Sequence, residues 1–232
     1  MPNYVTNRII MEGPEDEIKK VIDFLKKDDN PVDFNNIVQM PESLNMTSGS
    51  IEDQAIAVYA YKQKGNDSYI KKIFGYLWVK NAGIKSIDEL CEKLENENPG
   101  IIELGEKYVY NIETYGCSTW YDWCINNWGT KWNALDAYVE GNTIGFETAW
   151  SGVPELISKV SERFPKVAFK YRWADEDFGC NLGEYNFKVG VVISSYIPDA
   201  RSEEAYEMAA DILAYDAREY WDDEDEDDED DE

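Results

Sequence analysis

The first forty residues combine apolar runs with a helical pattern. Residues 5–11 are apolar and β-branched, which predicts a strand. Pro14 then stands where a first helical residue is favoured, and the three acidic residues after it suit the positive end of a helix dipole. These signals predict a helix over 14–27. A second, short strand is expected over 34–38.

Residues 45–128 have the spacing of helices rather than the alternation of strands. Ser86 and Glu89 form a capping-box pattern ahead of the apolar positions Leu90 and Leu94, which indicates a helix start. The region ends in an aromatic segment, and the whole pattern predicts a helical insertion.

After residue 131 the apolar period becomes two, as expected for strands with one buried face. Gly141-Asn142 stands between two alternating segments and predicts a hairpin. The elements expected after this hairpin are a helix over 154–164, strands over 167–173 and 185–193, and a helix over 202–220. The two strands should be antiparallel neighbours.

The chain is strongly acidic. Its 232 residues include 48 acidic and 22 basic side chains and no histidine, for a formal net charge of −26. Nucleic-acid phosphates need clustered Lys and Arg, so direct nucleic-acid binding is disfavoured, and anionic lipid is repelled in the same way. No apolar run approaches the roughly 20 residues of a spanning helix, and the N-terminus lacks a signal-peptide pattern. We therefore expect a cytoplasmic protein without a membrane role.

Acidic residues follow a regular pattern near the C-terminus. Every residue in 222–232 is acidic, and Glu203, Glu207 and Asp211 fall at i, i+4 and i+8 on the preceding predicted helix. An extended chain advances about 3.4 Å per residue, close to the phosphate spacing along a DNA strand. This pattern suggests one hypothesis, a surface that imitates nucleic acid. The alternative is a solvated face with a solubilising tail, and without the tail 37 acidic and 22 basic residues still give −15.

Trp123, Trp128, Lys131 and Trp132 are close in sequence and suggest an aromatic ligand patch. Exposed aromatics on RNA-binding sheets stack bases, but such platforms normally lie in basic grooves, and Lys131 and Arg172 are the nearby cationic candidates here. Large aromatics are also ordinary core material. Core packing is the favoured interpretation.

Residue types that carry enzyme chemistry are scarce. Histidine is absent, and Cys117 and Cys124 have no cationic setting that would activate a thiol. The four cysteines are expected to be reduced, and without histidine or a C-x-x-C motif no structural zinc site is expected. The loop 175–177 with Asp136 lacks the order of a calcium loop. We expect no catalytic residues, no metal and no cofactor.

Several short motifs are similar to those of a known family. They are Met1-Pro2-Asn3-Tyr4 with Asn7, Phe34 with Ile37 and Met40-Pro41, Tyr121-x-Trp123 before Asn127-Trp128-Gly129-Thr130-Lys131-Trp132, and Phe146-x-Thr148-x-Trp150 with Pro154. On these motifs the chain resembles the YubB-like family of phage and plasmid accessory proteins over 1–45 and 117–195. The resemblance implies a ferredoxin-like domain, a setting on mobile elements and no catalytic residues to carry over. The acidic tail and the extreme net charge depart from that family's pattern.

Pattern and resemblance together predict the α+β class, with a ferredoxin-like antiparallel sheet, helices on one face, a helical insertion and a disordered acidic C-terminal tail. The predicted parts are a core over 1–44 and 129–200, the insertion over 45–128, a helix over 201–221 and the acidic tail over 222–232.

The function expected from these observations is that of a non-enzymatic phage or mobile-element protein. It would bind and inhibit a basic, nucleic-acid-binding defence or regulatory protein in the host bacterial cytoplasm, as an acidic mimic of nucleic acid. The predicted partner-binding residues are Glu203, Glu207, Asp211, Asp222, Asp223, Glu224, Asp225 and Glu226. The competing hypothesis is a small-ligand or nucleotide-binding module using the aromatic patch. An open edge of the sheet would also allow a homodimer.

Overall fold

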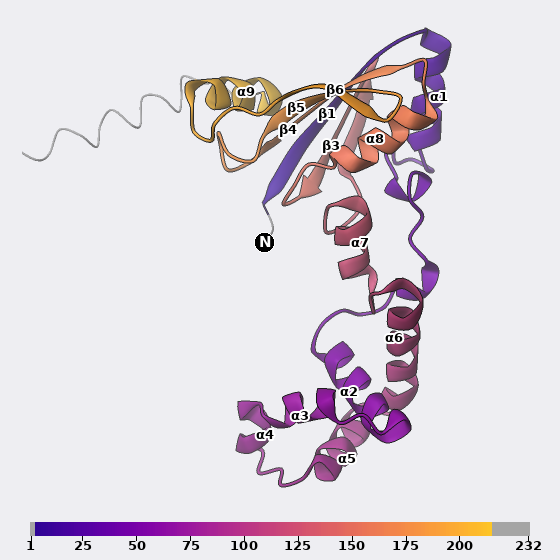
Figure 1. Cartoon of the computed structure of the whole chain (residues 1–232), viewed down its shortest axis with the longest axis vertical. Helices are drawn as coiled ribbons and strands as arrows, with labels where there is room; N and C mark the ends of the chain where they lie inside the picture. Colours follow the sequence, from indigo (N-terminus) through magenta and orange to yellow (C-terminus); the bar gives the residue numbers. More distant parts are fainter. Residues whose placement is uncertain (1–2, 215–232) are drawn as a thin grey trace, which may run out of the picture. The chain divides into compact units, whose positions relative to one another are not determined.

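The computed structural model describes residues 3–214, in which the chain forms two compact units (Figure 1). Unit 1 consists of Met1–Gln39 with Cys124–Glu232, and unit 2 is Met40–Trp123. Unit 2 occupies the region in which the sequence predicts the helical insertion, with both limits a few residues earlier. The predicted acidic tail, 222–232, lies outside the described residues.

Unit 1 is built on an antiparallel sheet that has six strands within the described residues, in the order β2-β3-β1-β4-β5-β6. The strands are β1 (Tyr4–Glu12), β2 (Leu135–Glu140), β3 (Thr143–Ala149), β4 (Ala168–Asp175), β5 (Gly183–Lys188) and β6 (Val191–Tyr196). Its α-helices are α1 (Glu15–Leu25), α8 (Pro154–Arg163) and α9 (Glu203–Leu213). Helix α7 (Trp120–Trp128) crosses the boundary between the units.

The order of these elements is that of a ferredoxin-like fold. The chain forms two βαβ halves, β1-α1-β2 and β3-α8-β4. In the sheet β3 lies between β2 and β1, and β4 lies on the other side of β1. Strands β5 and β6 then extend the sheet beyond β4. The predicted fold class is confirmed.

Both faces of the sheet carry helices. Val5, Ile9 and Met11 alternate with less buried residues along β1 and belong to the core that α1 and α8 cover. Tyr171 of β4 lies on this face too, because its hydroxyl accepts a hydrogen bond from the backbone N–H at the start of α8. Ala174, which points the other way, packs in a cluster with residues of α9. Helices therefore cover one face as predicted, and α9 adds cover to the other.

The predicted second strand over 34–38 is wrong, because the chain forms a 3₁₀ helix there, η1 (Phe34–Asn36). The Asp33 side chain accepts a hydrogen bond from the backbone N–H of Asn35, so it offers that N–H a local partner in place of a strand neighbour. Apolar spacing over so short a run does not distinguish the two structures.

The single strand predicted over 185–193 is also wrong, because β5 and β6 are separated by a two-residue turn. Val189 and Gly190 both have positive φ, 52° and 73°, as in the type I′ turns that join antiparallel strands. Alternation continues on both sides of the turn, so the apolar period alone conceals it. The last predicted helix, 202–220, is described as Glu203–Leu213, and its final residues lie outside the described part of the chain.

Unit 2 is helical. It comprises η2 (Glu42–Leu44), α2 (Ser50–Lys64), α3 (Ser68–Phe74), α4 (Leu77–Asn81), α5 (Ile87–Glu97) and α6 (Ile101–Tyr115), and α7 starts within it. The Ser86 hydroxyl caps α5 by accepting from the N–H of Glu89, while the Glu89 carboxylate binds the N–H of Lys85. Gly105 lets α6 approach α2 closely, since a Cβ at this position would lie 2.2 Å from the carbonyl oxygen of Ala55.

Candidate protein-interaction surface

Strand β6 forms an exposed, uncharged edge of the sheet. All of its residues are exposed, with 61% of the surface of Val191 and 64% of that of Ile193 accessible to solvent. It is the last strand in the order, so its outer backbone groups face no strand among residues 3–214. Edges are normally protected by charge, by proline or by a covering element. No residue in 189–198 is charged, although 30% of the chain is.

The turn before β6 is held in place by α8. The Ser158 hydroxyl donates to the carbonyl oxygen of Gly190 at 2.7 Å, and the N–H of Gly190 donates to the Ser161 hydroxyl at 3.2 Å. A Cβ on Gly190 would lie 3.0 Å from the Cβ of Glu162. These contacts attach the start of the exposed edge to α8.

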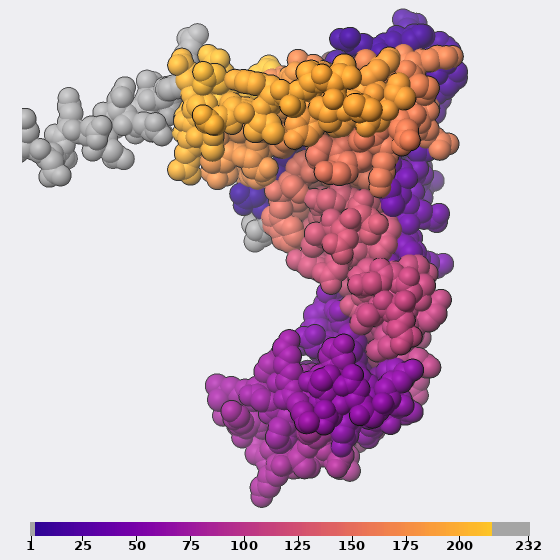
Figure 2. Space-filling view, viewed as in Figure 1, coloured from indigo at the N-terminus to yellow at the C-terminus, as the bar shows by residue number. Residues whose placement is uncertain are grey.

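An acidic helix end adjoins the far end of β6. Tyr196 and Ile197 line a hollow of about 280 Å³ together with Asp199, Ser202 and Glu204. The Ser202 hydroxyl caps α9 by accepting a hydrogen bond from Ala205. Figure 2 shows the orange-to-yellow residues of β6 and α9 along one face of unit 1. We use the term edge surface for β6, Ile197 and the two exposed acids in the first turn of α9, Glu203 and Glu204.

All three acids predicted on α9 are exposed, and one of them also forms an ion pair within unit 1. Glu203 and Glu207 are exposed. The Asp211 carboxylate forms an ion pair with Arg172 of β4, and its backbone oxygen accepts from Arg8 at 3.0 Å. The hydrogen bond from Arg172 is the main cause that lowers the pKa of Asp211. Asp211 thus attaches α9 to the sheet.

The remaining acids predicted to bind a partner lie outside the described residues. They are Asp222, Asp223, Glu224, Asp225 and Glu226.

The residues of the predicted aromatic patch are not equivalent. Trp123 of unit 2 and Trp128 of unit 1 are buried, with 6% and 3% of their surfaces exposed. The indole N–H of Trp128 donates to the carbonyl oxygen of Val38 at 2.8 Å. Lys131 instead lies between aromatic rings, with Nζ 4.7 Å from the ring centroid of Trp132 and 5.1 Å from that of Trp150. These positions favour the packing interpretation for both buried tryptophans.

The Trp-Gly-Thr-Lys-Trp segment joins the end of α7 to β3. The Thr130 hydroxyl donates to the carbonyl oxygen of Ala149 at 2.9 Å and accepts from its N–H at 3.0 Å. The Ser151 hydroxyl donates to the carbonyl oxygen of Gly129 at 2.6 Å. The hydroxyls of Thr130 and Ser151 bond to backbone groups in place of a neighbouring strand, so the motif has a structural role.

A second buried network crosses the sheet. Asn7 is fully buried and donates through Nδ2 to the hydroxyl of Thr148 at 2.8 Å. The Tyr171 hydroxyl donates to Asn7 Oδ1 at 2.5 Å and accepts from the N–H of Val153 at 2.6 Å. Burial raises the pKa of the Tyr171 phenol. The network links three neighbouring strands to α8 and explains why polar residues occupy core positions.

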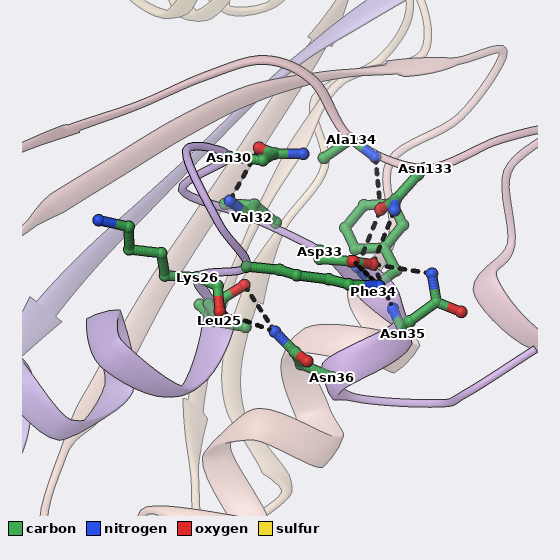
Figure 3. A network of polar contacts seen from close by, with 11 residues as sticks. Leu25, Lys26, Asn30, Val32, Asp33, Phe34, Asn35, Asn36, Asn133 and Ala134 are labelled. Carbon is green, nitrogen blue, oxygen red and sulfur yellow. Dashed lines mark hydrogen bonds and ion pairs between the residues drawn. The ribbon is translucent and has the colours of Figure 1, made fainter.

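A third network, shown in Figure 3, surrounds Asp33. Asn133 and Asn35 both donate to Asp33 Oδ1, at 2.7 and 2.8 Å, while Lys27 lies 3.2 Å from Oδ2. The N–H of Phe34 donates to Asn133 Oδ1 at 2.8 Å. Burial alone would raise the pKa of Asp33, but the hydrogen bonds from Asn133 and Asn35 and the contact with Lys27 hold it below its usual value. The network joins the segment after α1 to the segment before β2.

Three of the four cysteines and the first acid of the loop 175–177 are buried. The four cysteines, all in the described part of the chain, form no disulfide. Burial raises the pKa of Cys91 to about 11 and also raises that of Cys117, which makes both thiols poor nucleophiles at neutral pH. Asp175 is buried and accepts hydrogen bonds from Asn3 and Asn181.

No group of three or more Cys, Asp or Glu residues in 3–214 is placed to hold a metal ion. None of the helices in this range has the length and apolar character needed to cross a bilayer.

Comparison with known proteins identifies the domain type of unit 1. Residues 127–216 match the family model described as the ferredoxin-like domain in Api92-like protein. A solved structure, the crystal structure of protein api92 from Yersinia pseudotuberculosis, is 12% identical to this chain; the alignment covers 87% of this chain and 100% of that one, with a TM-score of 0.35. No curated protein matches the chain.

The family match confirms the ferredoxin-like domain, which the strand order also shows. It names Api92-like proteins rather than the YubB-like family. Membership of the YubB-like family and a setting on phages or plasmids therefore stay predictions.

The edge surface was not predicted from the sequence, because the alternating pattern over 185–193 predicts one strand where β5 and β6 are two. The available signals were Val189-Gly190 between two alternating runs and the absence of charge over 189–198.

Proposed function

We propose that this protein is a non-enzymatic accessory protein of a phage or other mobile element that binds a basic host protein through the edge surface. Binding would inhibit the partner by covering its nucleic-acid-binding surface in the host cytoplasm. The observation that carries this proposal is the exposed, uncharged strand β6 beside an acidic helix end.

The exposed strand supplies the means of attachment. An extended segment of a partner can add to an open sheet edge, where backbone hydrogen bonds provide affinity and alternating side chains provide specificity. Val191, Ile193 and Ile197 would form the apolar centre of such an interface. Exposed apolar side chains are unusual in such a highly charged chain, and they favour a surface that a partner covers when it binds.

The acidic residues supply partner selection. Glu203 and Glu207 lie on the helix that adjoins the edge, and the net charge of −26 attracts a basic partner over a distance. A protein that binds nucleic-acid phosphates offers the complementary sign of charge. The acids of 222–232 would add to this attraction.

The aromatic-patch hypothesis has less support. Trp123 and Trp128 are buried, so neither offers a ring face on which a base could stack. A nucleotide would also bring negative charge to an acidic protein.

The test is affinity capture from bacterial host lysate with the full chain, followed by identification of retained proteins by mass spectrometry. Ile193→Lys places a charge in the centre of the edge, and Val139→Lys, on the exposed strand β2 at the other edge, is the matched control. We expect one basic, nucleic-acid-binding protein to be retained by wild type and Val139→Lys, lost with Ile193→Lys and weakened by salt. The purified partner should then release its nucleic acid when the wild-type chain is added.

Three results would contradict the proposal. Retention of the partner by Ile193→Lys would exclude the β6 edge, and an undiminished partner–nucleic acid complex would exclude inhibition by coverage. A wild-type dimer that Ile193→Lys converts to a monomer would indicate that the edge pairs with a second copy of the chain instead.

A further inference from the structure

Basic residues are concentrated in one stretch of unit 2, which runs from the last turn of α2 to the residue before the cap of α5. Residues 62–85 contain six lysines and a single acid, Asp67, for a formal charge of +5. The 47 acidic and 16 basic residues in the rest of the chain give −31. The sign of the charge is therefore reversed locally in an acidic protein.

The six lysines are all exposed, but they differ in their partners. Lys62 pairs with Glu95 of α5, and Lys71 pairs with Asp67. Among residues 3–214 no acid forms an ion pair with the other four, which are Lys64, Lys72, Lys80 and Lys85. The ammonium groups of these four lysines are available to an anionic ligand.

Three aromatic rings are exposed within the same stretch. Tyr69 has 51% of its surface accessible to solvent, Tyr76 has 39% and Trp78 has 37%. Because α3 buries its two isoleucines, Tyr69 and Lys72 are exposed on its other face, and their spacing of three residues makes them neighbours there. Trp78 lies on α4, which packs beside α3 (Figure 1). We use the term basic surface for these three rings and the four lysines without an ion pair.

A hollow of about 260 Å³ adjoins the basic surface between α2, α3 and α6. Its exposed lining residues include Lys64 and Tyr69, and its floor includes the buried Tyr59. The Lys64 ammonium lies 5.9 Å from the ring centroid of Tyr59. On the α6 side it is lined by Val109, Ile112 and Glu113. A flat apolar group in this hollow would lie against aromatic rings with a cation beside it.

Cations and exposed rings together favour a polyanion that carries flat groups. Single-stranded nucleic acid has both, since its phosphates bind lysines and its bases stack on aromatic side chains. In a duplex the bases already stack on one another and offer no free face. An anionic bilayer would attract the lysines, but it presents a continuous surface rather than a separate flat group for the hollow. The acids elsewhere in the chain oppose binding only weakly beyond the screening length, about 8 Å at physiological ionic strength.

We propose that the basic surface of unit 2 binds single-stranded nucleic acid, with phosphates at Lys64 and Lys72 and a base stacked on Tyr69. The net charge of the chain disfavours direct nucleic-acid binding, but it averages over a surface of opposite sign. The inference does not depend on the proposed function, because the edge surface belongs to unit 1.

Fluorescence anisotropy with the full chain and a labelled oligothymidylate of about 12 nucleotides tests this proposal. We expect saturable binding that weakens as the salt concentration rises. Lys72→Glu should weaken it at least about fivefold, because a phosphate contact is replaced by repulsion. Tyr69→Ala should also weaken it at least about fivefold, because a stacking face is lost.

Two residues of α6 provide matched controls outside the basic surface. Lys107→Glu makes the same change in net charge at another exposed lysine, and Tyr110→Ala removes another exposed tyrosine. Both residues line a different hollow of unit 2. We expect both variants to bind as wild type does.

Several results would overturn the proposal. They are the absence of saturable oligothymidylate binding, unchanged affinity in Lys72→Glu or Tyr69→Ala, or losses in the two controls as large as in these variants. Equally tight binding of polyglutamate, a polyanion without bases, would show that the rings have no part. Equally tight binding of a duplex would exclude selection of single strands, and preferential binding to vesicles containing phosphatidylglycerol would indicate a membrane surface instead.

Discussion

Buried polar side chains determine how the segments of unit 1 meet. Asn7, Thr130 and Tyr171 occupy positions where an apolar residue would satisfy packing alone, yet each makes specific hydrogen bonds to a different strand or helix. An unpaired partner in such a network costs more than the bond contributes, so these contacts favour one arrangement over others. The short motifs noted in the sequence are therefore explained by architecture rather than by chemistry on a ligand.

Removing the Tyr171 hydroxyl should measure this effect. Tyr171→Phe leaves the N–H of Val153 and the Oδ1 of Asn7 each without this partner, and we expect the free energy of unfolding to fall by about 1–3 kcal/mol. Urea unfolding checks the change. Tyr185→Phe on the neighbouring strand is the control and should stay within about 0.5 kcal/mol of wild type. Equal effects of the two variants would show that the network contributes nothing beyond ring packing.

Asp33 should make unit 1 sensitive to acid. Its pKa is lowered in the folded protein, so it stabilises the fold above its unfolded pKa, and this contribution is lost as the pH falls through the folded value. In Asp33→Asn the new side-chain amide oxygen can still accept from Asn133 and Asn35, but it does not titrate. We expect stability to fall less steeply in Asp33→Asn than in wild type as the pH is lowered from about 5 to about 2.

Thermal unfolding across this pH range checks the Asp33 prediction. Asp29→Asn, an exposed change in the loop before Asp33, is the control and should follow the wild-type curve. A curve for Asp33→Asn that runs parallel to wild type would mean that Asp33 has no special part in acid stability.

At the level of elements, the contact between α2 and α6 depends on one glycine. A Cβ added to Gly105 would lie only 2.2 Å from the carbonyl oxygen of Ala55. In an exposed helix, replacing Gly by Ala would stabilise by about 1 kcal/mol. Here we expect Gly105→Ala to destabilise unit 2 by about 1–3 kcal/mol, because the helices must separate.

Circular dichroism during urea unfolding measures the Gly105→Ala change. Glu113→Ala, an exposed position of the same helix, should leave stability nearly unchanged. A gain in stability for Gly105→Ala would show that α2 and α6 tolerate a methyl group between them.

Elements also show where sequence patterns succeed and fail. The hairpin at Gly141-Asn142 and the helix between Pro154 and Pro165 were predicted, because glycine and proline mark their limits directly. The strand over 34–38 was wrong because Asp33 draws the following backbone into a local turn. The β5–β6 turn was missed because a β-branched residue, Val189, takes a positive φ that is rare for it, held by the contacts of Gly190 with α8.

At the scale of the whole molecule, charge is the dominant property. The net charge is −26, and the excess negative side chains repel one another more strongly in the compact folded state than in the unfolded chain. We expect added NaCl, from about 10 mM to about 300 mM, to raise the melting temperature by screening this repulsion. Differential scanning calorimetry at neutral pH provides the measurement.

A full-length variant with amides in place of the acids of 222–232 is the control for the salt prediction. Its net charge is −15, so its melting temperature should rise less with salt. A wild-type melting temperature that is unchanged or falls with salt would indicate that attractive ion pairs outweigh the repulsion.

The amino-acid sequence alone determined the class of fold, the helical character of the middle region, the acidic surface and the shortage of catalytic residue types. These depend on composition and on local periodicity, which each segment carries by itself. The tertiary structure decided that Trp123 and Trp128 are buried and that Asp211 pairs with Arg172. Within residues 3–214 it also decided that β6 is an edge strand. Each of these depends on contacts between residues distant in the chain, and local patterns do not specify which distant segment a side chain will meet.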